Sequence, residues 1–344
     1  MKHASSMILV AAIAACDPMP ADPVPTSPTP DDSAQLESRS GCYRENETTQ
    51  MFRLLGKNAG WELVSATPMN GWTTYHTQGM LKIGDAFYVS SVEVETRTEK
   101  NGTPTDALYD WSIDRSAGSG RGYVSKFNAA GDLLAQVEIT DGDIYHPGGM
   151  DFDGKHIWVP VAEYRPNSAS NIYRVDPDSL QAELVFSEDD HIGGVVYNRR
   201  RGTVHGVSWG SRRLYKWRKK GWGEWAGYRS NWQPNTAAYI DYQDCHYQGV
   251  EYMLCGGVNG YDSPLGKFAF GGLELVDLRT ARPDHQIPVN HFVDDGEGVN
   301  PTLSLAHNAF WAEPHGEGMR IYFMTERDNH ADLLTYQVTP WINR

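Results

Sequence analysis

YHTQGM at residues 75–80 returns as YHPGGM at residues 145–150, and this repetition decides the fold. A shift of 70 residues superposes the two stretches and the strand patterns that follow them without a gap. A shift of 165 residues brings the same pattern to a start near residue 241, and looser copies begin near residues 191 and 306. Self-similarity at such spacing is typical of folds built from repeated supersecondary units.

Each copy predicts four short antiparallel strands separated by Gly- and Asp-rich turns, a pattern typical of a β-propeller blade. The copy that begins near residue 306 has only three strands, and the segment WELVSATP at 61–68 can supply its fourth. Such a strand would close the ring and remove its open edges. We therefore predict an all-β fold, a five-bladed β-propeller over residues 61–344 closed by an N-terminal strand. A β-sandwich or another number of repeats is the alternative.

The first sixteen residues, MKHASSMILVAAIAAC, resemble a bacterial lipoprotein signal peptide in which Cys16 receives the lipid. Their apolar run is too short to span a bilayer. Residues 17–40 are rich in Pro, Ser, Thr and Asp, which predicts an extended tether, and residues 41–60 predict an extension with a short helix. We expect an exported protein that a lipid anchors to a bacterial membrane, in the periplasm or at the cell surface. An ordinary signal peptide that happens to contain a cysteine is the alternative.

Composition restricts the partners. The chain has 44 acidic and 30 basic residues and a net charge of −14, which argues against nucleic acid as a partner. We expect a monomer that binds a small molecule or a saccharide. Cys245 and Cys255 fall on neighbouring strands around one tight turn, where a cross-strand disulfide is geometrically feasible in an exported protein. Two buried free thiols are the alternative.

The repeated histidine lies where the innermost strand of a blade begins, so each copy is expected to point at one mouth of the central channel. Three histidines and a carboxylate at that mouth would suit Zn²⁺, Mn²⁺ or Fe²⁺ as a cofactor. Without a metal the same cluster would suit general acid–base chemistry, and a third interpretation has the histidines bond only the neighbouring blade. The predicted ligands are His76, His146, His191 and Asp241.

Carboxylates close the second strands of several blades and are expected around the same mouth, where they can act as acid and base. These predicted catalytic residues are Glu93, Glu163 and Glu326. Long loops leave the blades on this face, and loops on one face of a rigid scaffold commonly carry recognition. Aromatic side chains there can stack on sugar rings, although they can equally form the cores of ordered loops. The predicted substrate-binding residues are Tyr109, Trp111, Arg165, Trp209 and Asn259.

Two resemblances extend this picture. HTQGMLKIGDAFYVSSVE at 76–93 resembles the first blade of glutaminyl cyclases, which are five-bladed propellers. The later copies depart from those enzymes, so the cyclase site is not transferred. HPGGMDFDGKHIWVPVAEY at 146–164, with YQDC at 242–245 and MLCGG at 253–257, resembles a family of exported bacterial propellers known as a domain of unknown function. That resemblance implies the fold and no activity.

Three functions follow as hypotheses. The first is a metal-assisted hydrolase or lyase that acts on a saccharide at the histidine mouth. The second is a non-catalytic propeller that binds a ligand or a protein at the cell surface. The third is glutaminyl cyclisation.

Overall fold

The structure is a computed structural model that describes residues 45–104, 113–219, 231–236, 239–264, 266–294, 301–325, 327 and 329–340. The chain divides into Met1–Tyr43, which lies outside the described residues, and the compact unit Arg44–Arg344. The predicted signal peptide, its lipidated Cys16 and the tether over 17–40 therefore lie outside the described residues. Among the helices that the structure describes, none has the length and apolar character needed to cross a bilayer.

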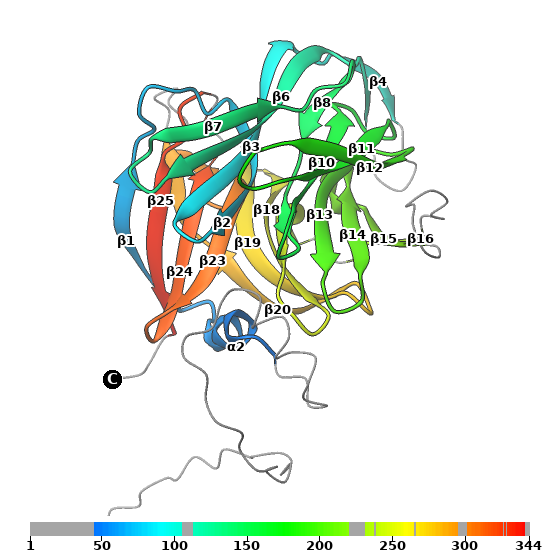
Figure 1. Cartoon of the computed structure of the whole chain (residues 1–344). Coiled ribbons are helices and arrows are strands. Elements are labelled where there is room, and N and C mark those ends of the chain that lie inside the picture. Colours follow the sequence, from blue (N-terminus) through cyan, green and yellow to red (C-terminus); the bar gives the residue numbers. More distant parts are fainter. Residues whose placement is uncertain are drawn as a thin grey trace, which may run out of the picture. The chain divides into compact units, whose positions relative to one another are not determined.

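Five antiparallel sheets form a ring, which confirms the predicted five-bladed β-propeller (Figure 1). The first blade consists of β2 (His76–Ile83), β3 (Ala86–Thr96), β6 (Ser119–Asn128) and β7 (Leu133–Glu138). The second consists of β8 (Ile144–Pro147), β9 (Asp151–Phe152), β10 (Ile157–Glu163), β11 (Ser170–Val175) and β12 (Ala182–Glu188). The third consists of β13 (Ile192–Asn198), β14 (Thr203–Ser208), β15 (Arg213–Arg218) and β16 (Asn231–Pro234).

The fourth blade consists of β17 (Asp241–Tyr247), β18 (Tyr252–Ser263), β19 (Gly266–Asp277) and β20 (Arg282–Val289). The fifth consists of β23 (Asn308–His315), β24 (Gly318–Thr325), β25 (Leu333–Thr339) and β1 (Gly60–Thr67). Strand β1 pairs with β25 along its whole length, so this sheet contains strands from both ends of the propeller sequence. The remaining elements are α2 (Glu47–Leu54), β4 (Lys100–Pro104), β5 (Ile113–Arg115), η1 (Trp209–Ser211), β21 (Phe292–Asp294) and β22 (Pro301–Ser304).

The glycines of the repeated stretches bring the inner strands together at the axis. A Cβ on Gly79 would lie 2.6 Å from the Cα of Gly149, and a Cβ on Gly149 would lie 2.7 Å from the carbonyl oxygen of Gln243. Neither distance leaves room for a methyl group against rigid backbone. The glycine of the motif is therefore required by close approach of three blades.

The fourth copy of the motif has Asp244 at the position of Gly79 in the first copy. The carboxylate of Asp244 lies beside Gly79 and Gly149, in the space that a Cβ on either glycine would enter. Its Oδ2 accepts hydrogen bonds from the N–H of Met80 at 2.8 Å and of Phe310 at 3.3 Å. Its Oδ1 accepts from the N–H of Met150 at 3.2 Å. Asp244 is fully buried, so one side chain ties its own blade to three others. The methionine of the motif is thus held by its backbone N–H.

Cys245 and Cys255 stand directly opposite each other on β17 and β18 and are joined by a disulfide, with an S–S distance of 2.05 Å. Both residues are buried. Asn46 caps the N-terminus of helix α2, and its side chain accepts from the Thr49 N–H at 2.8 Å. The hydroxyl of Thr49 donates to the Gln248 carbonyl at 3.1 Å, in the turn that follows β17. The described chain therefore begins at the end of the propeller opposite to the starts of the innermost strands (Figure 1).

Candidate functional site

Three of the four predicted metal ligands meet at the mouth of the propeller. His76 begins β2, His146 lies in β8 and His191 directly precedes β13. The ring centroid of His146 lies 6.1 Å from that of His76 and 5.7 Å from that of His191. Each innermost strand starts at the same end of the molecule, so the repeat delivers its histidine to one place in three consecutive blades.

His146 lies between the other two histidines of this cluster and is deeply buried. It is 5% exposed, and neither ring nitrogen has a hydrogen-bond partner among the described residues. One face of the ring stacks on Tyr164 at 4.1 Å between centroids. Burial, together with the neighbouring His191 and His76, holds the pKa of His146 well below its usual value, so the ring is neutral. A buried polar group without a partner is unfavourable, and native proteins keep few of them.

His191 is oriented by the backbone. Its Nδ1 lies 2.7 Å from the carbonyl oxygen of Glu163, which can only accept, so Nδ1 carries the proton and Nε2 keeps its lone pair. Burial lowers the pKa of His191. The ring of Trp209 meets it edge-on at 4.8 Å, which places this predicted substrate-binding residue beside the histidine cluster.

Asp241, the fourth predicted ligand, is engaged elsewhere. Its Oδ1 lies 2.7 Å from Nη2 of Arg212 and forms a close ion pair with it. Burial raises the pKa of Asp241 to about 6, and Arg212 opposes that shift. No contact of this carboxylate with the histidine rings is found in the described residues. Within those same residues, no group of three or more His, Cys, Asp or Glu side chains is arranged as a ready-made metal site.

The predicted carboxylates have different surroundings. Glu93 Oε2 accepts a hydrogen bond from the Tyr123 hydroxyl at 3.0 Å. Glu163 Oε2 lies 2.5 Å from both Nε and Nη2 of Arg165, so this predicted acid–base residue and this predicted substrate-binding residue neutralise each other. Asn259 pairs with Phe270 in the ladder between β18 and β19. The predicted residues Glu326, Tyr109 and Trp111 lie outside the described residues.

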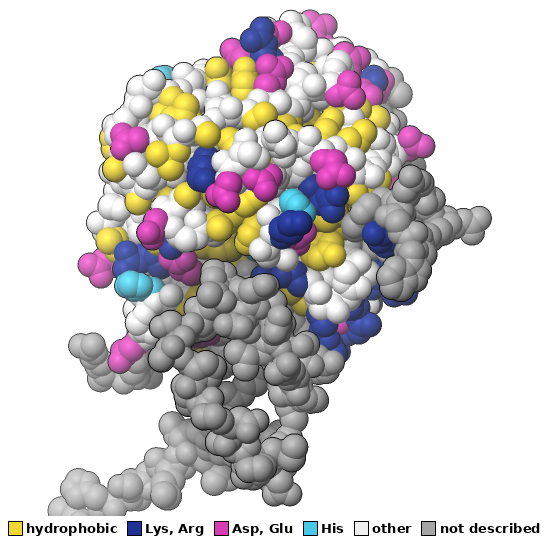
Figure 2. Space-filling model, viewed as in Figure 1, with side chains coloured by type: hydrophobic (Ala, Val, Ile, Leu, Met, Phe, Trp, Pro, Cys, Tyr) yellow, Lys and Arg dark blue, Asp and Glu magenta, His cyan; other side chains and the backbone are white. Residues whose placement is uncertain are grey.

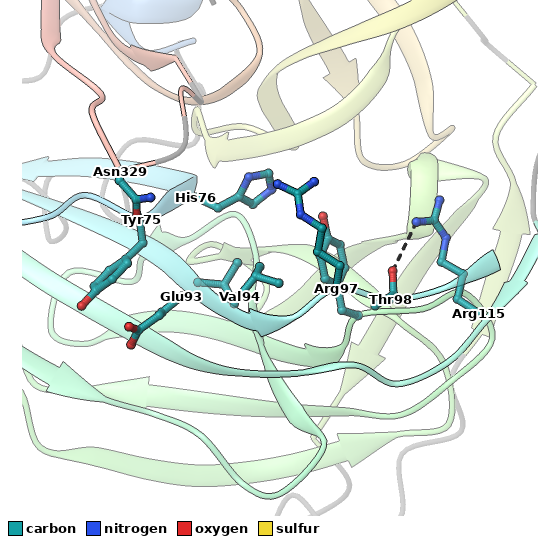
Figure 3. Close-up of a pocket in the computed structure, with 10 residues that line it drawn as sticks. Tyr75, His76, Glu93, Val94, Arg97, Thr98, Arg115 and Asn329 are labelled. Atoms are coloured by element: carbon teal, nitrogen blue, oxygen red, sulfur yellow. Dashed lines mark hydrogen bonds between the residues drawn. The ribbon is translucent and has the colours of Figure 1, made fainter. Parts of the chain in front are cut away.

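A pocket of about 500 Å³ adjoins the cluster (Figure 3). Its lining residues are Tyr75, His76, Val92, Glu93, Val94, Arg97, Thr98, Arg115, Tyr164 and Asn329. Tyr164 connects the pocket with the cluster, because its ring stacks on His146 and lies 6.2 Å from the ring of His76. Tyr75, which directly precedes His76, has a φ of 52° and stacks on Tyr123 at 5.2 Å.

Sequence reasoning did not assign a role to Tyr164, Arg97 or Asn329. Tyr164 directly follows Glu163, the last residue of β10, and strand ends were already expected at the mouth. An aromatic residue in that position was therefore a usable signal. Asn329 reaches the pocket from the turn between β24 and β25, where its N–H donates to the Tyr75 carbonyl at 3.2 Å. No pattern in the sequence links those two segments.

Comparison with solved structures gives distant likenesses. A luciferin-regenerating enzyme is 8% identical, with a TM-score of 0.44 over 82% of this chain and 95% of that chain. The periplasmic gluconolactonase of Pseudomonas aeruginosa is 13% identical, with a TM-score of 0.37 over 76% of this chain and 86% of that chain. The search of curated proteins gives no match. Residues 39–340 match the model of a family of unknown function, DUF6454, and the chain belongs to that family, as its resemblance to an uncharacterised propeller family implied.

Proposed function

We propose that the histidine mouth is the active site of an exported enzyme, a metal-assisted hydrolase or lyase that acts on a saccharide. The observation that carries this proposal is His146, a buried neutral imidazole that lies between His76 and His191. Neither ring nitrogen of His146 has a hydrogen-bond partner among the described residues. Neutral imidazoles are good ligands for divalent transition metals, and a bound ion would satisfy this otherwise unfavourable group.

The side chains at the mouth are of the type that binds such an ion. His76, His146 and His191 would hold it, and the hydrogen bond from His191 Nδ1 to the Glu163 carbonyl is the contact that commonly orients a ligating histidine. Zn²⁺, Mn²⁺ or Fe²⁺ would supply Lewis acidity toward a substrate oxygen or a bound water. Asp241 is not needed in this set, because Arg212 already neutralises it.

The neighbouring pocket supplies the organic groups that the reaction needs. Glu93 lines it and is available to take a proton, from water in hydrolysis or from carbon in elimination. Its partner Tyr123 remains protonated, because burial and Glu93 raise the pKa of that hydroxyl to about 12. Tyr75 and Tyr164 offer ring faces on which a sugar can stack.

Export and anchoring through Cys16 belong to the same proposal. The first described helix, α2, packs at the end of the propeller opposite the histidines.

Elemental analysis of the purified chain tests the proposal, alongside a His76→Ala/His146→Ala double variant and His315→Ala as a control. His315 is exposed, and its position at the end of β23 places it away from the cluster. We expect about one equivalent of Zn, Mn or Fe in the parent and in the control, and none in the folded double variant. A parent that neither contains nor takes up any of these metals would contradict the metal site.

Three further assays separate the other hypotheses. If the metal is absent and the double variant stays folded, loss of saccharide turnover in Glu93→Gln would indicate acid–base chemistry without a metal. Thermal stabilisation by a saccharide without turnover would favour a binding propeller. Conversion of a peptide with N-terminal glutamine would favour a cyclase.

A further inference from the structure

We infer that the pocket beside the histidines binds an anionic group on its saccharide, a carboxylate or a phosphate, through Arg97 and Arg115. The inference rests on the proposed function for the saccharide, and on the pocket itself for the charge. Both arginines line the pocket of about 500 Å³, a volume in the range usual for small-molecule sites.

Arg115 is held by its surroundings while part of its hydrogen-bonding capacity is unused. Its Nη1 lies 3.5 Å from the Thr98 hydroxyl, and its guanidinium lies over the Trp209 ring at 5.1 Å from the centroid. Its Nε is buried and has no hydrogen-bond partner among the described residues. A guanidinium cannot lose its proton, so a buried donor of this kind requires an acceptor, and an anionic oxygen is the strongest one.

The pocket is polarised along its length. Figure 3 shows Glu93 beside Tyr75 at one end and Arg115 at the other, with His76 and Arg97 between them. Among the described residues of the lining, Glu93 is the one carboxylate, against two guanidinium groups. The anionic group of the saccharide would therefore bind at the Arg115 end of the pocket. The neutral part of the saccharide would then lie against His76 and Glu93.

The local positive charge of the two arginines is opposite in sign to the net charge of the chain. The net charge is −14, and Figure 2 shows carboxylates spread over the face in view. An acidic surface repels anions in general, so two arginines in one cavity indicate specific recognition at short range. Planar guanidinium groups bind carboxylate and phosphate in two-point contacts, which also fix orientation.

Binding to the metal-free chain tests the inference without relying on catalysis. The probes are D-galacturonate, D-galactose 6-phosphate and neutral D-galactose, compared by titration calorimetry after treatment with a chelator. We expect at least tenfold tighter binding of one anionic sugar than of galactose, and the tighter of the two identifies the anion. Equal binding of all three, or binding of none at 10 mM, would overturn the inference.

Arginine variants locate the anion. Arg115→Gln should remove the preference for the anionic sugar, and Arg97→Gln, at an exposed position, serves if the first variant does not fold. Arg174→Gln is the control, because Arg174 pairs with Glu183 on the outer strands of the second blade. Retention of the full preference in both pocket variants would contradict the assignment. Metal content measured on the same preparations before the chelator is added reports separately on the proposed active site.

Discussion

At the scale of single residues, the buried side chains of Asp244 and His146 differ in their hydrogen-bond partners. Asp244 is surrounded by donors, since three backbone N–H groups point at its carboxylate. His146 is also buried, but its ring nitrogens have no hydrogen-bond partner among the described residues. A satisfied buried group stabilises the fold, whereas an unsatisfied one costs free energy and persists where a ligand completes it. Asp244 therefore serves the architecture, and the contrast supports the proposed functional role of His146.

Asp244→Ala should destabilise the protein strongly. It removes the carboxylate that accepts from the Met80, Met150 and Phe310 N–H groups, and each buried unsatisfied donor costs about 1–3 kcal/mol. We expect the free energy of unfolding to fall by about 3–5 kcal/mol in urea titrations followed by circular dichroism. Asp178→Ala, at a side chain that is 97% exposed, should stay within about 0.5 kcal/mol of the parent. A loss below about 1 kcal/mol for Asp244→Ala would argue against its central role.

At the scale of strands, close approach of the inner strands explains the glycines of the motif. Gly149→Ala should cost about 2–3 kcal/mol, because its Cβ would meet Gln243 O at 2.7 Å, Asp244 Oδ1 at 2.8 Å and Asp244 Cα at 2.9 Å. The matched control is Gly260→Ala, where a Cβ meets nothing within 4 Å. Calorimetric melting should separate the two variants. Equal melting temperatures would show that the axis tolerates a methyl group.

The strand pattern was predictable because each blade repeats one local arrangement of apolar strands and turns. The pairing of β4 with β5 and of β21 with β22 was not, since these strands interrupt the repeat. The break between β8 and β9 was not predictable either. There the Gly149 N–H donates to the Gly193 carbonyl at 2.9 Å, a contact with the next blade that local sequence does not encode.

The candidate site was predictable where it follows the repeat, and not where it depends on the loops. His76, His146 and His191 come together because they occupy one position of the repeat. Asp241 occupies the corresponding position in β17 but pairs with Arg212, and Glu163 pairs with Arg165. Those pairings depend on side chains from loops of variable length, which the repeat does not determine.

At the scale of the whole molecule, burial shifts acids and histidines in opposite senses. Burial raises the pKa of Asp151 and of Glu274 to about 7, so both remain protonated in the folded protein at pH 5, although the unfolded chain has released these protons. Burial lowers the pKa of His205 to about 3 and of His246 to about 4, so both remain neutral while the unfolded chain protonates them. Between about pH 4.5 and 6 the two sets oppose each other.

Single variants should therefore separate the two contributions to the pH dependence of stability in this window. A raised carboxyl pKa means that the folded state binds the extra proton, so stability falls as pH rises; a lowered histidine pKa has the opposite sign. Asp151→Asn should make the slope of unfolding free energy against pH more positive by up to about 1.4 kcal/mol per unit, and His205→Gln should make it more negative by a similar amount. Urea titrations at four pH values between 4.5 and 6 measure both slopes. Because the readout is a slope, a uniform loss of stability in either variant does not obscure it, and Glu274→Gln should repeat the sign of Asp151→Asn. Parallel slopes in all variants would mean that these buried groups titrate alike in the folded and unfolded chains, which their burial in a well-packed propeller argues against.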